Sequence, residues 1–237
     1  MRSRSAVFLF VFAAASGLAA GRAISGRAAQ PSAAGGPAQA SSAASAWPKD
    51  IHSETGNRLP AIKREDLDEA GKKMFDARGP SADFFGPAPI RLYSPQVAEH
   101  MGAVNDYLRN KSGLDPRLVQ LAILVTAREF DCEYVWTAHE PQGLKAGLEP
   151  QVIDVVRYRK PLQGVAEKDS VIIQMGREVI VKHRVSADLA ARAAKLFGKR
   201  QLVEYVSLMG DYAATTVLLN AFDQHVRPAD KPLLPIP

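Results

Sequence analysis

The spacing of apolar and polar residues predicts helices throughout the region after residue 50. The clearest segment is Arg117–Leu148, in which apolar residues recur at helical spacing at Leu118, Leu121, Ala122 and Val125. Asp115 and Pro116 stand immediately before it, as a helix cap and a first helical residue. Gly147 and Pro150 mark its end.

Further helices are expected on both sides of this segment. Gly198 should close one of them, and Asp66 or Glu65 should cap the first. No segment alternates cleanly between apolar and polar residues, so the predicted fold is all-α. The ranges are Arg64–Ala77, Pro95–Arg109, Glu149–Tyr158, Ala166–Lys182, Ala187–Phe197 and Arg200–Phe222.

The first 23 residues are typical of a secretory signal peptide. Arg2 and Arg4 precede an apolar run, Ala6–Ala15, and small residues follow as far as Ala23. The run is short for a membrane span, although an uncleaved anchor is the alternative. We therefore expect a periplasmic or secreted protein with no stable membrane insertion after cleavage.

The rest of the chain divides by composition. Residues 24–50 are mostly Ala, Ser, Gly and Pro, as in a flexible linker. Residues 51–226 have the length and apolar content of one helical domain, and 227–237 form a proline-rich tail. Removing residues 1–23 takes away three arginines and no acid, which lowers the formal charge from +5 to +2. Basic residues form no block, so we expect no nucleic-acid partner.

Chemically capable side chains gather in the central segment. Cys132, Trp136 and His139 are spaced four and three residues apart, which places them near one face of a continuous helix. Such a face resembles the wall of a small-molecule pocket. Each residue also has a structural interpretation, since a lone cysteine or tryptophan on an apolar face is commonly core, and a histidine can be a cap.

Other classes of site lack support in the sequence. The remaining histidines show no metal-ligand spacing, so we expect no metal. Glycine-rich phosphate loops and the G-x-S-x-G motif of hydrolases are absent, and we expect no cofactor.

The motifs resemble those of the carboxymuconolactone decarboxylase family, whose superfamily includes the alkylhydroperoxidase D-type peroxidases. The resemblance lies in LAILVTAR (Leu121–Arg128), EYVWTAHE (Glu133–Glu140), AGL (Ala146–Leu148) and LNAF (Leu219–Phe222). It implies an alkylhydroperoxidase D-like helical fold that assembles as a dimer, trimer or hexamer, with active sites near subunit contacts.

The peroxidase branch implies a C-x-x-C pair, a histidine and a glutamate. On this chain the first cysteine corresponds to Cys132 and the histidine to His139. Val135 stands at the second cysteine position and Gln120 at the glutamate position. The two-cysteine mechanism is therefore excluded by the sequence.

The decarboxylase branch needs no cysteine. Its chemistry requires a proton-transfer group, a donor for the developing oxyanion and a cation for the substrate carboxylate. We assign these roles to His139, Gln120 and Arg128, with Trp136 as a further substrate contact.

Three functions follow as hypotheses. The first is an exported carboxymuconolactone decarboxylase-like enzyme for a small organic acid or lactone, with His139 as the proton-transfer residue. The second is a single-cysteine hydroperoxide reductase with peroxiredoxin-like activity at Cys132. The third is a non-catalytic oligomeric helical module.

Overall fold

Helix α4 (Pro116–Glu129) lies at the centre of the fold, which is described here by a computed structural model for residues 47–236. As expected, Asp115 caps it, its side chain accepting from the Arg117 amide at 2.9 Å, and Pro116 is the first helical residue. Every residue from Leu118 to Arg128 is buried. The predicted signal peptide and most of the predicted linker lie outside the described residues.

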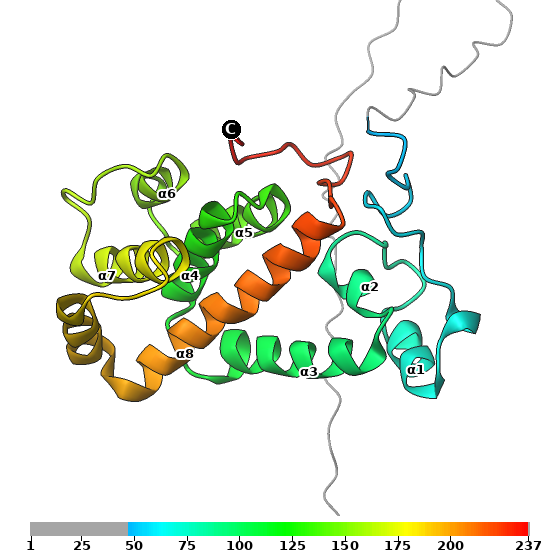
Figure 1. Cartoon of the computed structure of the whole chain (residues 1–237), viewed down its shortest axis with the longest axis horizontal. Helices are drawn as coiled ribbons and strands as arrows, with labels where there is room; N and C mark the ends of the chain where they lie inside the picture. The colour runs from blue at the N-terminus through cyan, green and yellow to red at the C-terminus, as the bar shows by residue number, and fades with distance from the viewer. Residues whose placement is uncertain (1–46, 237) are drawn as a thin grey trace, which may run out of the picture. The chain divides into compact units, whose positions relative to one another are not determined.

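Four helices pack around α4. It packs against α5, α6, α7 and α8, while α8 also contacts α2 and α3 (Figure 1). The described residues contain one isolated β-bridge, between His52 and Asn57, and no sheet, which confirms the all-α prediction. The helices are α1 (Glu69–Ala77), α2 (Pro87–Arg91), α3 (Pro95–Asp106), α5 (Glu133–Lys145), α6 (Pro150–Arg157), α7 (Glu167–Gly176) and α8 (Ala187–Ala221), and π-helical turns extend α3 (Tyr107–Lys111) and α7 (Arg177–Val181).

The central segment is a helical hairpin, whereas the sequence predicted a continuous helix. α4 ends at Glu129, Asp131 has a φ of 48°, and Cys132 is the extended residue before α5. Asp131 tolerates this backbone better than most residues. Its carboxylate also pairs with Arg128 at 3.2 Å and Arg159 at 3.1 Å. The reversal lays α5 back along α4, so residues equally far from the turn face each other.

The first predicted helix begins later than expected. Its cap is Asp68, whose side chain accepts from the Gly71 amide at 2.7 Å, rather than Asp66 or Glu65. Residues 64–66 instead form a single 3-10 turn. This turn places Leu67 in a small cluster with Ile62 and Leu92, and burial of that leucine outweighs continuation of the helix.

Two features of the C-terminal part position the site. α8 is bent at Gly198, whose φ of 71° suits glycine, as predicted. The packed part of the chain extends past residue 226. Leu234 belongs to the core, the Leu233 amide donates to Thr137 Oγ1 at 3.2 Å, and Arg128 Nη1 donates to the Pro235 carbonyl at 2.8 Å.

None of the helices between residues 47 and 236 has both the length and the hydropathy that crossing a membrane requires.

Candidate functional site

His139 connects three helices through both of its ring nitrogens. Its Nδ1 lies 2.9 Å from Oε1 of Gln120 on α4, and its Nε2 lies 3.2 Å from the hydroxyl of Tyr212 on α8. The His139 and Tyr212 rings meet edge to face, with centroids 5.2 Å apart. The hairpin explains the first contact, since it packs α5 against α4 and brings His139 beside Gln120.

These contacts are compatible with one tautomer of the neutral ring. With Oε1 of Gln120 facing Nδ1, the proton is assigned to Nδ1 of His139, and Nε2 is the acceptor for the Tyr212 hydroxyl. His139 is 8 % exposed. Burial, and secondarily the charge of Arg109, lower its pKa to about 3. At pH 7 the imidazole is therefore neutral and offers a proton acceptor, not a proton donor.

Tyr212 is as deeply enclosed as the histidine. Burial raises the pKa of its hydroxyl, whereas the nearby charge of Arg109 and a hydrogen bond from Asn105 lower it. The same Asn105 amide donates to Asp211 Oδ2 at 2.7 Å. Asn105 thus couples the His139–Tyr212 pair to a buried carboxylate.

Two arginines approach this pair from the α2–α3 side. Arg109 lies in the π-helical turn after α3, where its Nη2 donates to Gln142 Oε1 at 3.2 Å. Its Nε is buried and has no hydrogen-bond partner among the described residues. Arg91, on α2, donates to Thr215 Oγ1 at 2.6 Å, and burial lowers its pKa.

The charges of this cluster favour an anion. Arg91 and Arg109 carry two positive charges, and Asp211 supplies one negative charge beside a neutral histidine and tyrosine. Asp211 is itself buried, and its Oδ1 has no hydrogen-bond partner among the described residues. A carboxylate ligand would offset the excess positive charge and accept from the free guanidinium N–H of Arg109.

Trp136 lies away from this cluster, although the sequence grouped it with His139. Its Nε1 donates to Glu140 Oε2, and the guanidinium of Arg157 lies 5.6 Å from its ring centre. Glu140 and Arg157 also form an ion pair. The indole is 0 % exposed, so it is a core side chain stabilised by a buried ion pair.

Arg128 is also separate from His139. It is near the C-terminal end of α4, where it bonds to Pro235 and Asp131. Gln120 lies two helical turns earlier, so the proposed oxyanion donor, Gln120, and the proposed carboxylate-binding cation, Arg128, occupy different ends of the helix. The cations that act on the His139–Tyr212 pair are Arg109, whose charge affects both residues, and Arg91, whose charge affects Tyr212.

Cys132 lies at the start of α5, beyond the turn. It is 1 % exposed, and burial raises the pKa of its thiol to about 11, only partly opposed by backbone N–H groups at Val135 and Tyr134. A thiolate is therefore disfavoured here.

Five residues of this cluster were missed by the sequence reasoning: Arg91, Asn105, Arg109, Asp211 and Tyr212. A weak signal existed for Tyr212. In α8 the polar residues Asp211, Tyr212 and Thr215 interrupt an otherwise apolar buried stripe that includes Leu208 and Leu219. The arginines and Asn105 have no comparable signal, because they come from α2, from α3 and from the π-helical turn after it, and tertiary packing brings them to the site.

A metal site is not evident in this part of the chain. Between residues 47 and 236, no group of three or more His, Cys, Asp or Glu side chains is arranged to hold a metal ion.

A comparison with models of known protein families gives a match that includes the α4–α5 hairpin. The carboxymuconolactone decarboxylase family model matches residues 95–172, which run from the start of α3 into α7. No curated protein matches the chain. Gln120, His139 and Arg109 lie within the matched segment, whereas Tyr212 and Arg91 lie outside it. The segment from Pro95 to Ile172, which carries the hairpin and its histidine, therefore matches the carboxymuconolactone decarboxylase family.

Proposed function

We propose that the protein is an exported carboxymuconolactone decarboxylase-like enzyme that acts on a small organic acid or lactone, with His139 as the proton-transfer residue. The observation that supports this most strongly is a neutral, buried histidine–tyrosine pair beside two arginines. A site of this kind attracts a carboxylate and offers it a proton-exchanging group in a dry environment.

The arginines determine the class of substrate. Arg109 and Arg91 are the anion-binding groups in this proposal, taking the role that the sequence had given to Arg128. The reaction breaks the bond between the substrate and its departing carboxylate, which leaves as carbon dioxide. The bonding electron pair passes to a conjugated carbonyl, and a proton then replaces the lost group at carbon.

Binding of the substrate prepares His139 to handle that proton. In the free protein, burial and the Arg109 charge together lower the pKa of the imidazole to about 3. The negative charge of a carboxylate held at Arg109 offsets the second effect. Substrate binding therefore raises the pKa of His139 toward its ordinary value, while burial, the larger effect, continues to lower it.

Access to His139 requires a rearrangement. Both ring nitrogens are bonded in the resting protein, and little of the side chain is exposed. A substrate group that reaches Nε2 must take the place of the Tyr212 hydroxyl. We infer that Tyr212 moves aside or passes its own proton between substrate and imidazole.

The burial of Cys132 argues against the alternative of single-cysteine hydroperoxide reduction. A peroxide must reach a thiolate, and this thiol is enclosed with its pKa raised to about 11. The non-catalytic module predicts neither turnover nor anion binding. Export rests on the signal-peptide pattern of residues 1–23, and assembly as a homo-oligomer belongs to the same proposal.

Carbon dioxide release tests this function. Purified protein is given carboxymuconolactone and a panel of related carboxy-lactones and keto acids. Replacing Arg109 with Met should raise KM by about tenfold or more, because a charge-assisted hydrogen bond to the carboxylate is lost. Arg64→Met is the control, since its pair with Asp76 is on the surface.

Equal KM values for the two arginine variants would remove Arg109 from the site. Absence of carbon dioxide release across the panel, together with absence of carboxylate binding in calorimetry, would favour the non-catalytic module.

A further inference from the structure

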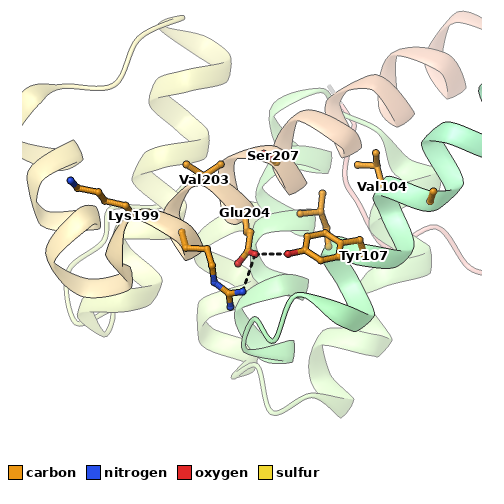
Figure 2. A pocket seen from close by; sticks show the side chains of 9 residues that line it. Val104, Tyr107, Lys199, Val203, Glu204 and Ser207 are labelled. Atoms are coloured by element: carbon orange, nitrogen blue, oxygen red, sulfur yellow. Dashed lines mark hydrogen bonds and ion pairs between the residues drawn. The ribbon is translucent and has the colours of Figure 1, made fainter.

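A cavity lies between α3 and α8, and none of the residues that line it belongs to the His139 cluster. Its volume is about 780 Å³, a size that holds a small organic molecule. One wall comes from the end of α3 and its π-helical turn, and the other comes from α8 (Figure 2). The lining includes Val104, Tyr107, Leu108, Val203, Glu204 and Ser207.

Apolar side chains line most of this groove while remaining open to solvent. Val203 is 64 % exposed, and Val104 and Tyr107 are exposed to nearly half of their surface. Exposed valines on two facing elements form a continuous apolar surface, which is typical of a binding groove.

Glu204 places a carboxylate in this apolar surface. It is 6 % exposed, and its Oε1 accepts from the Tyr107 hydroxyl at 2.9 Å (Figure 2). Its second oxygen, Oε2, is buried and has no hydrogen-bond partner among the described residues. A buried carboxylate oxygen without a donor is unfavourable, so a ligand that brings a donor to this atom gains a hydrogen bond that the protein does not supply.

Charges at the end of the groove restrict what that donor can be. Arg200 lies 3.7 Å from Glu204 Oε1, and its other nitrogen donates to the Ser112 carbonyl at 3.1 Å. Lys199 lines the same end and points away from Glu204 (Figure 2). These two cations repel an ammonium group, and Glu204 repels a carboxylate. A neutral hydroxyl donor avoids both penalties.

We propose that this groove binds a small apolar phenol or alcohol, whose hydroxyl donates to Glu204 Oε2 while its hydrocarbon part lies against Val104 and Val203. The site is independent of the His139 cluster. Its ligand class is also different, because the His139 cluster favours an anion and this groove favours a neutral donor.

Calorimetric titration with matched probes tests the proposal. The four probes share one hydrocarbon chain and differ only in the head group: 4-hexylphenol, 4-hexylanisole, 4-hexylbenzoate and 4-hexylbenzylammonium. We expect 4-hexylphenol to bind at least about tenfold more tightly than the other three, because it alone offers a neutral donor. Equal affinities of 4-hexylphenol and 4-hexylanisole would overturn the role of Glu204.

Two variants locate the binding. Glu204→Gln removes the charge of the acceptor and should weaken 4-hexylphenol about tenfold with little effect on 4-hexylanisole. Val203→Asp should abolish binding of both. Val217→Asp is its matched control, since Val217 is a similarly exposed valine of α8 that does not line the groove. Thermal unfolding of each variant confirms that it is folded.

A second copy of the chain is the competing occupant of the groove. It predicts that wild-type protein binds none of the probes and that Val203→Asp lowers the mass measured by light scattering while Val217→Asp does not. That result would overturn the proposal. Binding of 4-hexylphenol that is unchanged in both Glu204→Gln and Val203→Asp would also overturn it.

Discussion

Burial of His139 should make the stability of the protein depend on pH in the mildly acidic range. The imidazole has an ordinary pKa of 6.5, and in the folded protein burial lowers it to about 3. Between these two values the unfolded chain binds a proton at this position and the folded protein does not. Lowering the pH therefore favours unfolding, and the stability contributed by the neutral ring is complete only above about pH 6.5.

The size of the effect follows from the shift in pKa. Each unit of pH within the window costs about 1.4 kcal/mol of unfolding free energy for one proton. From about pH 7.5 to about pH 5, His139 alone should remove about 2 kcal/mol. That is a substantial fraction of the stability of an ordinary domain.

Urea unfolding of wild-type protein and His139→Gln, followed by circular dichroism at a fixed protein concentration, measures this loss. Glutamine retains a polar side chain but does not titrate, so the variant should lose about 2 kcal/mol less than wild type over the same pH interval. His100→Gln, at an exposed position of α3, is the control and should follow wild type. Identical pH dependence of wild type and His139→Gln would refute the inference that the buried ring is neutral.

Three further predictions concern other parts of the fold. Cys132 in the native protein should react with iodoacetamide at least about a hundredfold more slowly than in the unfolded chain, because burial keeps the thiol in its unreactive, protonated form. Similar rates in the two states would show that the thiol is accessible. Gly176→Ala should destabilise the fold by about 1 to 3 kcal/mol, since the added carbon would lie 2.3 Å from Val125 Cγ1. Gly210→Ala is the control, since its added carbon meets no atom within 4 Å, and it should be neutral or stabilising by up to about 1 kcal/mol. Equal changes in the free energy of unfolding of the two variants, measured in urea, would contradict the close packing at Gly176. Leu234→Ala should cost about 2 to 5 kcal/mol if the tail is part of the core, and no change in the unfolding midpoint would show that the tail contributes nothing.

The sequence predicted those parts of the fold that local signals determine. Asp115 and Pro116 begin α4 as expected, and Gly198 bends α8 where glycine predicted a break. Such signals act over one helical turn, so they can be found without knowledge of the tertiary structure.

The break at Asp131 was not predicted because its cause is not local. Its unusual backbone conformation is held in part by Arg159, which lies far along the chain. Without the break, Cys132, Trp136 and His139 form one continuous helical face. With it, Cys132 precedes the helix, and the indole and the imidazole contact different partners.

The candidate site was therefore predicted only in part. Gln120 and His139 were identified through resemblance to the family, and the structure brings them into hydrogen-bond contact. Tyr212 and Arg109 reach the same place from α8 and from the turn after α3. Their positions depend on how separate helices pack, which periodicity within a single helix does not reveal.

The most direct test of the proposed function compares two variants on one identified substrate. His139→Gln and Cys132→Ser are assayed for carbon dioxide release, with folding and oligomeric mass measured for each. Loss of proton transfer should lower kcat of His139→Gln by about a hundredfold or more, whereas Cys132→Ser should keep nearly full turnover. Full turnover by His139→Gln, or loss of turnover by Cys132→Ser with its fold intact, would contradict the assignment of the chemistry to the histidine.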